Sequence, residues 1–377
     1  MSKYKIMTPG PVQVPENVRL ARSISTTNAD LDPQFYDEYK ETCELISKLL
    51  HTKNETLILS GEGILGLEAA CASMTESGDR VLILDNGIYG AGFADFVSMY
   101  GGTAVMYTKD YKNAFDVNEL DAYLKKDHDF KYATIVHCDT PSGMLNDIHK
   151  ICPLLKSYGI MTVTDSVSGM FGNEVDVDKA QIDILCGGSQ KAVSAPPGLT
   201  FVTISDEAKA AMENRKTPIA SFYCNLTIFK DYYKNLWFPY TMPISDIYGL
   251  KAAIDNIAAD KDLIKRHAKI ANATREALKE FGIKLHLESG FSDTVTVFDV
   301  PEGMTADDIL KRMREDHHIM LAGSFGDLAG KVIRIGHMGA SANVGDMLEV
   351  MSGLEETLRY LGWKSEKSLL KSFHDKL

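Results

Sequence analysis

The sequence lacks the features that mark membrane, secreted and metal-binding proteins. Among its 377 residues, no apolar run approaches the roughly 20 residues that a membrane-spanning helix requires. Residues 1–5 carry no apolar signal segment. The six cysteines are widely scattered, without a Cys-x-x-Cys pair or a Cys/His ligand spacing. We therefore expect a cytoplasmic protein whose cysteines are reduced and mostly packed, and we expect no metal site.

Positive charge is also in short supply. The chain has 40 Lys and Arg residues against 52 Asp and Glu residues, which gives a formal net charge of -12 and a pI near 5.3. Such a chain offers no electrostatic footprint for nucleic acid or for an anionic membrane. With 45% hydrophobic residues it should be globular, and its length favours two domains. We expect small-molecule partners, no nucleic acid and no membrane.

Apolar, strand-like segments alternate with helix-like segments after an initial helix at 33–50. The predicted strands are 56–59, 80–84, 103–107, 133–137 and 160–164, and the helices between them are 64–74, 90–100 and 148–158. Strands separated by helices of 10 to 15 residues indicate crossover units and a mainly parallel sheet.

The rhythm changes near residue 246. A helical stretch to about 281 precedes further short elements, with strands at 284–287, 294–300, 319–322 and 332–335 and helices at 306–316 and 345–360. We predict an α/β protein with an N-terminal segment near the active site (1–20), a large domain (21–258) and a smaller α/β domain (259–377).

One lysine lies in a short polar segment between two apolar runs. The segment 187–198 separates the strand-like runs 182–186 and 199–204, and Lys191 is near its centre. An ammonium group held close to buried backbone is poorly solvated, so its pKa falls and a nucleophilic amine results. Most lysines are solvated surface groups. The motifs around Lys191 must therefore decide its role.

A glycine-rich turn precedes the helix predicted at 64–74. Gly61, Gly63 and Gly66 match the dinucleotide-binding pattern, and Asp85 follows Gly66 by about 20 residues. A glycine turn at a helix N-terminus favours a phosphate in any case. Two points argue against a dinucleotide site. Glu62 places a negative charge among the backbone N–H groups that would bind the phosphate, and the mechanism of such an enzyme gives Lys191 no role. A nicotinamide-dependent dehydrogenase is the alternative interpretation.

Polar residues follow several of the predicted strands. Tyr89 emerges after one strand, where its ring could stack on a flat cofactor. Thr140 and Asp165 follow two others on the same edge of the sheet, and a carboxylate there needs a cationic partner. A site for pyridoxal phosphate needs a phosphate-binding turn, an aromatic ring, a hydroxyl group, an acid and a lysine, and the sequence offers all of them.

These motifs resemble those of the class V (fold type I) pyridoxal-phosphate aminotransferases, in particular the alanine–glyoxylate and serine–pyruvate aminotransferase group. The resemblance covers nearly the whole chain. It rests on Thr8-Pro9-Gly10-Pro11, Ser60-Gly61-Glu62-Gly63, Asn86-Gly87-Ile88-Tyr89-Gly90, Asp165-Ser166-Val167, Ser189-Gln190-Lys191-Ala192 and Arg334-Ile335-Gly336. It implies a large domain with a mainly parallel sheet of the seven-stranded type, and a smaller C-terminal α/β domain.

The resemblance also implies roles for individual residues. Lys191 forms a Schiff base with pyridoxal 5'-phosphate, Asp165 pairs with the pyridine nitrogen and Tyr89 stacks on the ring. Thr140 lies near the ring hydroxyl, and Gln190 helps to bind the phosphate.

Further roles follow from the same resemblance. Arg334, with Gly10 nearby, binds the substrate carboxylate, a task that suits a planar guanidinium. The other cofactor-binding residues expected are Gly61, Glu62, Gly63, Ile64 and Val167.

Such enzymes build the phosphate site partly from the partner subunit, so a homodimer with shared active sites is implied. The segment 238–243 resembles the contributing stretch, and Thr241 falls on the position whose hydroxyl reaches the phosphate. Phe238 stands where relatives usually have tyrosine, Glu62 replaces a serine, and Ile64 occupies a position that is histidine in some members. Backbone N–H groups of Gly63 and Ile64 remain as phosphate donors.

We therefore expect a ping-pong transaminase that moves an amino group from alanine or serine to glyoxylate or pyruvate, with Lys191 as the proton carrier. Aminotransferases for 2-aminoethylphosphonate or ureidoglycine share the scaffold and remain alternatives. A domain that binds the cofactor without catalysis is a further alternative, which Arg334 argues against.

Overall fold

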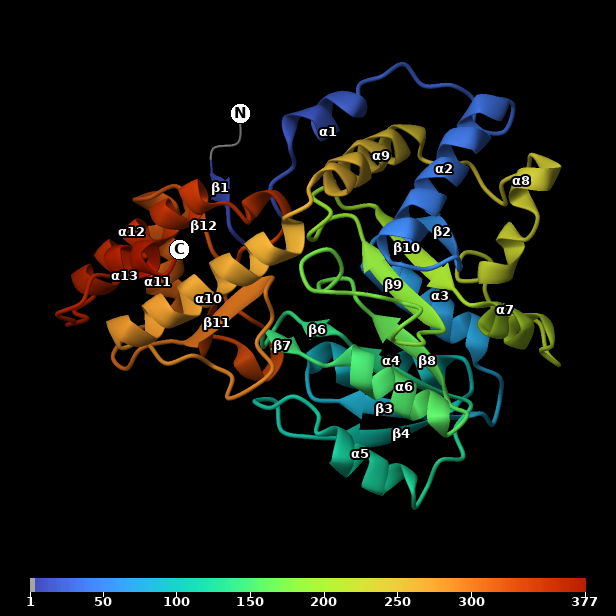
Figure 1. Cartoon of the computed structure of the whole chain (residues 1–377), viewed down its shortest axis with the longest axis horizontal. Coiled ribbons are helices and arrows are strands. Elements are labelled where there is room, and N and C mark those ends of the chain that lie inside the picture. The colour runs from blue at the N-terminus through green and yellow to red at the C-terminus, as the bar shows by residue number, and fades with distance from the viewer. Residues whose placement is uncertain (1–3) are drawn as a thin grey trace.

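In the computed structural model, which describes residues 4–377, a seven-stranded sheet forms the centre of the larger unit (Figure 1). The strand order is β2-β10-β9-β8-β5-β3-β4. The strands are β2 (Glu55–Ser60), β3 (Arg80–Asp85), β4 (Thr103–Thr108), β5 (Tyr132–Val136), β8 (Met161–Asp165), β9 (Ile184–Gly188) and β10 (Leu199–Ile204). Only β10 runs against its neighbours, β2 and β9. The prediction of a mainly parallel α/β sheet is confirmed.

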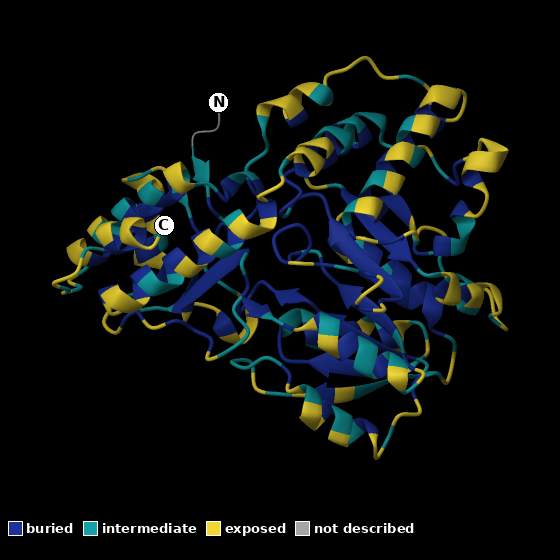
Figure 2. Cartoon of the chain, viewed as in Figure 1, coloured by how far each residue is buried: buried dark blue, intermediate teal, exposed yellow. Residues whose placement is uncertain are grey.

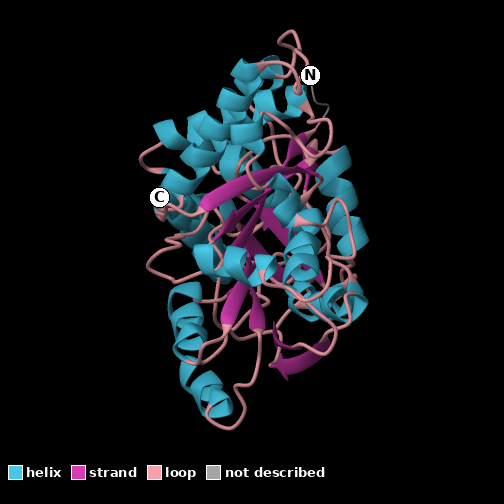
Figure 3. Cartoon of the chain, turned by 90° about the vertical axis from the view of Figure 1, so that its right-hand side faces the viewer, coloured by secondary structure: helices cyan, strands magenta, loops and turns pink. Residues whose placement is uncertain are grey.

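Helices lie on both sides of this sheet (Figure 3). They are α2 (Pro33–Leu49), α3 (Gly63–Met74), α4 (Ile88–Met99), α5 (Val117–Leu124), α6 (Ile148–Ser157), α7 (Asp206–Glu213), α8 (Tyr232–Asn235) and α9 (Ile244–Ala259). Every residue of β5 and β10 is buried, which fits strands covered on both faces (Figure 2). Asp32 and Pro33 fix the start of helix α2. The Asp32 side chain accepts a hydrogen bond from the Gln34 N–H, and Pro33 is favoured as the first residue of a helix.

A smaller unit holds most of the C-terminal chain, orange to red in Figure 1. Its elements are α10 (Leu263–Phe281), β11 (Val295–Asp299), α11 (Ala306–Glu315), β12 (Ile319–Met320), β13 (Val332–Gly336), α12 (Val344–Tyr360) and α13 (Leu369–Asp375). Its hydrophobic cluster is separate from that of the larger unit. The predicted domain boundary near residue 258 stays a prediction.

The N-terminal chain connects the two units. Strand β1 (Lys5–Ile6) pairs in parallel with β12, and Met7 joins the cluster of the smaller unit. The short helix α1 (Glu16–Ala21) then packs against α9 of the larger unit. The remaining short strands, β6 (Cys138–Asp139) and β7 (Met144–Leu145), pair with each other.

Two predicted elements were wrong. The helical stretch expected from 246 to 281 is two helices, because Asp260 is extended and its side chain accepts the Asp262 N–H at 3.2 Å, which competes with the helical backbone. The strand expected at 284–287 does not form a ladder. Leu285 makes one isolated bridge to Phe298.

The carboxyl ends of several strands lie together at one edge of the sheet. The carboxyl ends of β3, β5, β8 and β9 lie there because these strands are parallel. The carboxyl end of β2 joins them, since Ser60 pairs with Leu199 at the start of β10. The turn between β9 and β10, with Lys191 in it, is on the same edge.

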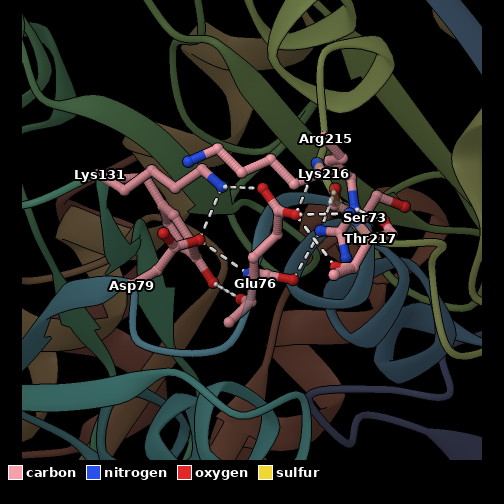
Figure 4. A network of polar contacts seen from close by, with 9 residues as sticks. Ser73, Glu76, Asp79, Lys131, Arg215, Lys216 and Thr217 are labelled. Carbon is pink, nitrogen blue, oxygen red and sulfur yellow. Dashed lines mark hydrogen bonds and ion pairs between the residues drawn. The ribbon is translucent and has the colours of Figure 1, made fainter.

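A polar network holds a surface segment at the opposite edge (Figure 4). Glu76, just after α3, accepts hydrogen bonds from the backbone N–H groups of Lys216 at 2.8 Å and Thr217 at 2.9 Å. Lys131 approaches the other Glu76 oxygen at 3.6 Å and bonds Asp79 at 2.6 Å. These contacts fix the beginning of the segment 215–243.

We predict that Glu76→Ala lowers the free energy of unfolding by roughly 1–2 kcal/mol, because two backbone donors lose their acceptor. Burial opposes the charged carboxylate, but the Thr217 and Lys216 donors dominate and lower the pKa of Glu76 from 4.5 to about 2. A lowered pKa stabilises the fold above pH 4.5, and this contribution disappears as the pH falls through about 2.

Urea unfolding of both proteins at several pH values measures the effect, with exposed Glu41→Ala on α2 as the control. The two unfolding curves should converge as the medium becomes more acidic. A difference that does not change with pH would contradict the assignment.

Candidate active site

A cavity of about 310 Å³ opens at the edge of the sheet where these strands end. Segments that are far apart in the sequence meet there. The predicted site residues that line it are Gly10, Glu62, Gly63, Ile64, Tyr89, Asp165, Val167, Gln190 and Lys191. Pro11, Leu67, Cys138, Ser168 and Pro197 also line it, although no individual role was predicted for them.

Lys191 is partly buried in the turn between β9 and β10. Its Nζ donates a hydrogen bond to the carbonyl of Pro9 at 2.7 Å. Burial lowers the pKa of this amine from 10.5 to about 8, while Cys138 and Asp165 oppose the shift and Arg334 adds to it. Roughly one amine in ten is therefore neutral at pH 7. A neutral amine is nucleophilic, which is the property that a Schiff-base lysine needs.

The N-terminal segment approaches Lys191 so closely that a side chain would not fit. Gly10 has a φ of +106°, and a Cβ atom there would lie 2.6 Å from Lys191 Nζ. The segment is held from the other side, where the Gly336 N–H donates to the Met7 carbonyl at 2.8 Å. Pro9 thus presents its carbonyl to the amine. The sequence could not reveal this contact, because a backbone carbonyl has no side-chain signature.

Asp165 ends β8 at the same cavity and is 5% exposed. Burial raises its pKa from 3.8 to about 7, against the lowering effects of the Val167 N–H, which donates at 2.8 Å, and of Lys191. A buried carboxyl group with one backbone donor is stabilised by a cation. The protonated nitrogen of a pyridine ring is such a cation.

Tyr89 lies in the first turn of α4, and a buried acid fixes that turn. Asp139 accepts the Tyr89 N–H at 3.0 Å and the Ser142 hydroxyl at 2.7 Å. Gly87 is required beside it, since a Cβ atom there would lie 2.4 Å from the Asp139 carboxyl carbon. Sequence reasoning missed Asp139, although its place beside Thr140 at a strand end was a usable signal.

Arg334 lies on β13 and is not among the residues that line the cavity. Its Nε donates to the Gly323 carbonyl at 2.5 Å, and one terminal nitrogen lies 3.4 Å from the Thr140 carbonyl. Burial lowers its pKa, and the nearby Tyr89 and Asp139 oppose that shift. The guanidinium charge acts on Lys191. Thr140 is buried but does not line the cavity.

At the α3 end of the cavity, Glu62 occupies the expected phosphate position. Its Oε1 accepts the Ile64 N–H at 3.0 Å, and its Oε2 accepts from the Gln190 amide at 3.3 Å. Gln190 Oε1 is buried without a hydrogen-bond partner. Lys191 is the only cation among the described residues that line the cavity.

The cavity residues therefore fit the two ends of pyridoxal phosphate differently. Lys191, Asp165 and Tyr89 match the aldehyde, the nitrogen and the face of the ring. The phosphate end offers a carboxylate, and one of the two expected backbone donors already bonds it.

Three predicted residues or contacts lie elsewhere. The Gly61 N–H bonds the Gly198 carbonyl at 2.9 Å, and Thr241 is exposed outside the cavity of a single protomer. Phe238 is 3% exposed and stacks on Tyr36 with ring centroids 4.5 Å apart. Core packing thus accounts for the phenylalanine. The roles assigned to the site residues stay predictions.

Two expected absences concern the described residues alone. Within residues 4–377, no helix is long and apolar enough to cross a membrane. In the same part of the chain, no group of three or more His, Cys, Asp or Glu side chains is arranged to hold a metal ion. All six cysteines lie in this part of the chain and are buried and free.

We predict that Lys191 reacts with a small acylating reagent with a midpoint near pH 8, because burial has lowered its pKa. Competitive labelling followed by peptide mass spectrometry measures this. Lys150 is the internal control, since its side chain is 70% exposed and Asp147 raises its pKa. Equal midpoints for the two lysines would contradict the burial of the Lys191 amine.

Comparison with known proteins identifies relatives over most of the chain. The family model described as aminotransferase class-V matches residues 18–333. An uncharacterized aminotransferase from Methanocaldococcus jannaschii is 32% identical over 370 residues, 97% of this chain and 95% of the relative. A pyridoxamine–pyruvate transaminase from Mesorhizobium japonicum is 32% identical over 89% of this chain and 86% of the relative. The crystal structure of ureidoglycine–glyoxylate aminotransferase from Bacillus subtilis superimposes with a TM-score of 0.94 at 29% identity, covering 100% of this chain and 98% of that one.

Proposed function

The chain belongs to the class-V aminotransferase family, and we propose that it transfers an amino group between a pyridoxal ring bound at Lys191 and a small 2-oxo acid. One observation carries the proposal. An amine with a pKa lowered to about 8 and a carboxyl group with a pKa raised to about 7 line the same cavity. Groups whose pKa values are shifted by burial towards neutral pH are suited to transferring protons.

Pyridoxal 5'-phosphate, the cofactor predicted from the sequence, supplies this ring, and so does its unphosphorylated form. Lys191 would bind the aldehyde, Asp165 the ring nitrogen and Tyr89 the ring face, with Thr140 near the ring hydroxyl. When bound, the ring withdraws electrons from the substrate and so acidifies the hydrogen on its α-carbon. Asp139 supports this arrangement because it fixes the turn that carries Tyr89.

The residues of the chain perform the proton transfers. With the ring bound, Lys191 would move a proton between the substrate α-carbon and the carbon next to the ring. Its pKa of about 8 leaves it able both to accept and to release a proton near neutral pH. The Pro9 carbonyl orients the amine, and the apolar side chains of Leu67 and Val167 limit the entry of water.

A single guanidinium favours a substrate with one carboxylate. Nε of Arg334 donates a hydrogen bond to the Gly323 carbonyl, and this bond restrains the orientation of the guanidinium group. Alanine or serine as the amino acid, with pyruvate or glyoxylate as the oxo acid, meets this requirement. A 2-aminoethylphosphonate substrate would need a cationic partner for its phosphonate, and ureidoglycine remains an alternative.

The contacts of Asp85 argue against the dehydrogenase alternative, in which this residue would bind a ribose hydroxyl. Both oxygens of Asp85 already have donors, the Tyr111 hydroxyl at 2.8 Å and the Thr108 hydroxyl at 3.0 Å. Asp85 is 4% exposed. A ribose hydroxyl would have to displace these internal bonds.

A homodimer that completes the cavity is also part of the proposal. In one protomer, Glu62 and Ile64 are exposed although they line the cavity. Phe222, Tyr223 and Trp237 are more than half exposed on the segment 215–243. Exposed aromatic side chains grouped on one segment suit a surface that a partner covers.

We predict that a pyridoxyl adduct forms on Lys191 when the protein is mixed with pyridoxal or its phosphate and reduced with borohydride. Peptide mass spectrometry detects it. Lys191→Ala should lose both the adduct and turnover, whereas exposed Lys150→Ala should keep both. Wild-type protein that gains no pyridoxyl mass on the Lys191 peptide would falsify the proposal.

We predict that Arg334→Gln raises the KM for pyruvate by about 10- to 100-fold, because a charge-assisted bond to the carboxylate is lost. The Lys191 adduct should still form, since the guanidinium does not hold the ring. Steady-state kinetics give the KM, and the exposed Arg314→Gln on α11 is the control. An unchanged KM would place the carboxylate elsewhere.

A further inference from the structure

The α3 end of the cavity presents hydrogen-bond acceptors where a phosphate needs donors. We propose that this end binds the free hydroxymethyl group of an unphosphorylated pyridoxal-type molecule, so that pyridoxamine and pyridoxal are exchanged as substrate and product. Glu62 is the residue that sets this preference. The inference rests on the proposed function, and it narrows the form of the ring that the cavity accepts.

Glu62 excludes a phosphate in two ways. Its Oε1 accepts the Ile64 N–H at 3.0 Å, so a free donor at the start of α3 is already used. Its carboxylate would also lie beside a phosphate dianion, and Lys191, which the ring itself requires, is the only cation among the described lining residues. The segment 238–243, which we expect the partner to contribute, contains no Lys, Arg or His.

Gln190 supplies an independent observation. The residue is 7% exposed and lines the cavity, and its Oε1 has no hydrogen-bond partner. Its amide nitrogen donates to Glu62 Oε2 at 3.3 Å, so a flipped amide would place two acceptors against each other. The unpaired atom is therefore the carbonyl oxygen.

A buried carbonyl oxygen without a donor is costly, and an O–H group would satisfy it. Glu62 and Gln190 are thus two acceptors at one end of the cavity. A free alcohol can donate to them, whereas a phosphate ester ionised at neutral pH brings only acceptors.

The transfer balances without a further reagent. The bond between nitrogen and the 4'-carbon of pyridoxamine breaks, and that carbon is oxidised to the aldehyde of pyridoxal with oxygen from water. The carbonyl carbon of pyruvate is reduced as it gains the amino group and becomes alanine, and its oxygen leaves as water. Lys191 carries the proton from the 4'-carbon to the α-carbon, and the electron pair follows through the ring.

A ring that enters and leaves in each turnover changes the expected kinetics. Pyridoxamine and pyruvate must occupy the cavity together, so double-reciprocal plots should intersect. A ring that stays bound between the two half-reactions gives the parallel lines of a ping-pong enzyme.

The test compares the binding of pyridoxal and pyridoxal 5'-phosphate to the whole protein, through adduct absorbance and the borohydride-trapped mass on the Lys191 peptide. Wild-type protein should bind pyridoxal at least about tenfold more tightly. Glu62→Gln, which keeps an acceptor for the Ile64 N–H but removes the charge, should narrow this ratio. Glu62→Ser, which also frees space, should reverse it. The control is Glu41→Gln, an exposed glutamate on α2 outside the cavity, which should leave the ratio unchanged.

The outcomes separate the two proposals. If the phosphate form binds wild-type protein as tightly as pyridoxal, or if both Glu62 variants keep the wild-type ratio, the preference is overturned while the proposed function stands. If neither compound labels Lys191, the proposed function fails. With pyridoxamine and pyruvate, free pyridoxal and alanine should accumulate far beyond the amount of enzyme. Release of no more than one equivalent of pyridoxal would also overturn the exchange.

Discussion

One amine and one carboxyl group are buried at the same edge of the sheet, and the proposed chemistry of this chain depends on their burial. Burial disfavours both charges, so the pKa of Lys191 falls to about 8 and that of Asp165 rises to about 7. Each group partly stabilises the charge of the other. The cavity therefore holds a nucleophilic amine and an acid able to pair with a cation, which is the combination that a pyridoxal ring requires.

Close contacts that depend on glycine maintain this arrangement. Gly10 lets the N-terminal segment touch the Lys191 side chain, and Gly87 leaves room for the Asp139 carboxyl group that fixes Tyr89. Because the N-terminal chain also pairs with β12 and bonds Gly336, the position of the amine depends on both units of the molecule. The surroundings of the amine are thus linked to the packing of the smaller unit.

Much of this was predictable from sequence, for a simple reason. In a parallel sheet the carboxyl ends of the strands meet, so polar residues after apolar runs identify one site even when their exact contacts are unknown. Tyr89, Asp165 and Lys191 were predicted in this way, whereas Gln190 was predicted from the family resemblance, and all four line one cavity. The Pro9 carbonyl was not, because backbone contacts between distant segments leave no residue signature. The break at Asp260 was missed because a local side-chain bond overrode a continuous helical pattern.

Glu62 shows where a family resemblance and local chemistry differ. The resemblance predicts a phosphate at the start of α3, but the carboxylate already bonds the Ile64 N–H and faces the Gln190 amide. The most direct measurement is a crystal structure of the protein with pyridoxal bound. We predict continuous density from Lys191 Nζ to the ring, Asp165 at the ring nitrogen, and the free hydroxyl between Glu62 and Gln190. A ring bound away from Lys191, or a phosphate bound at α3 with Glu62 turned away, would contradict it.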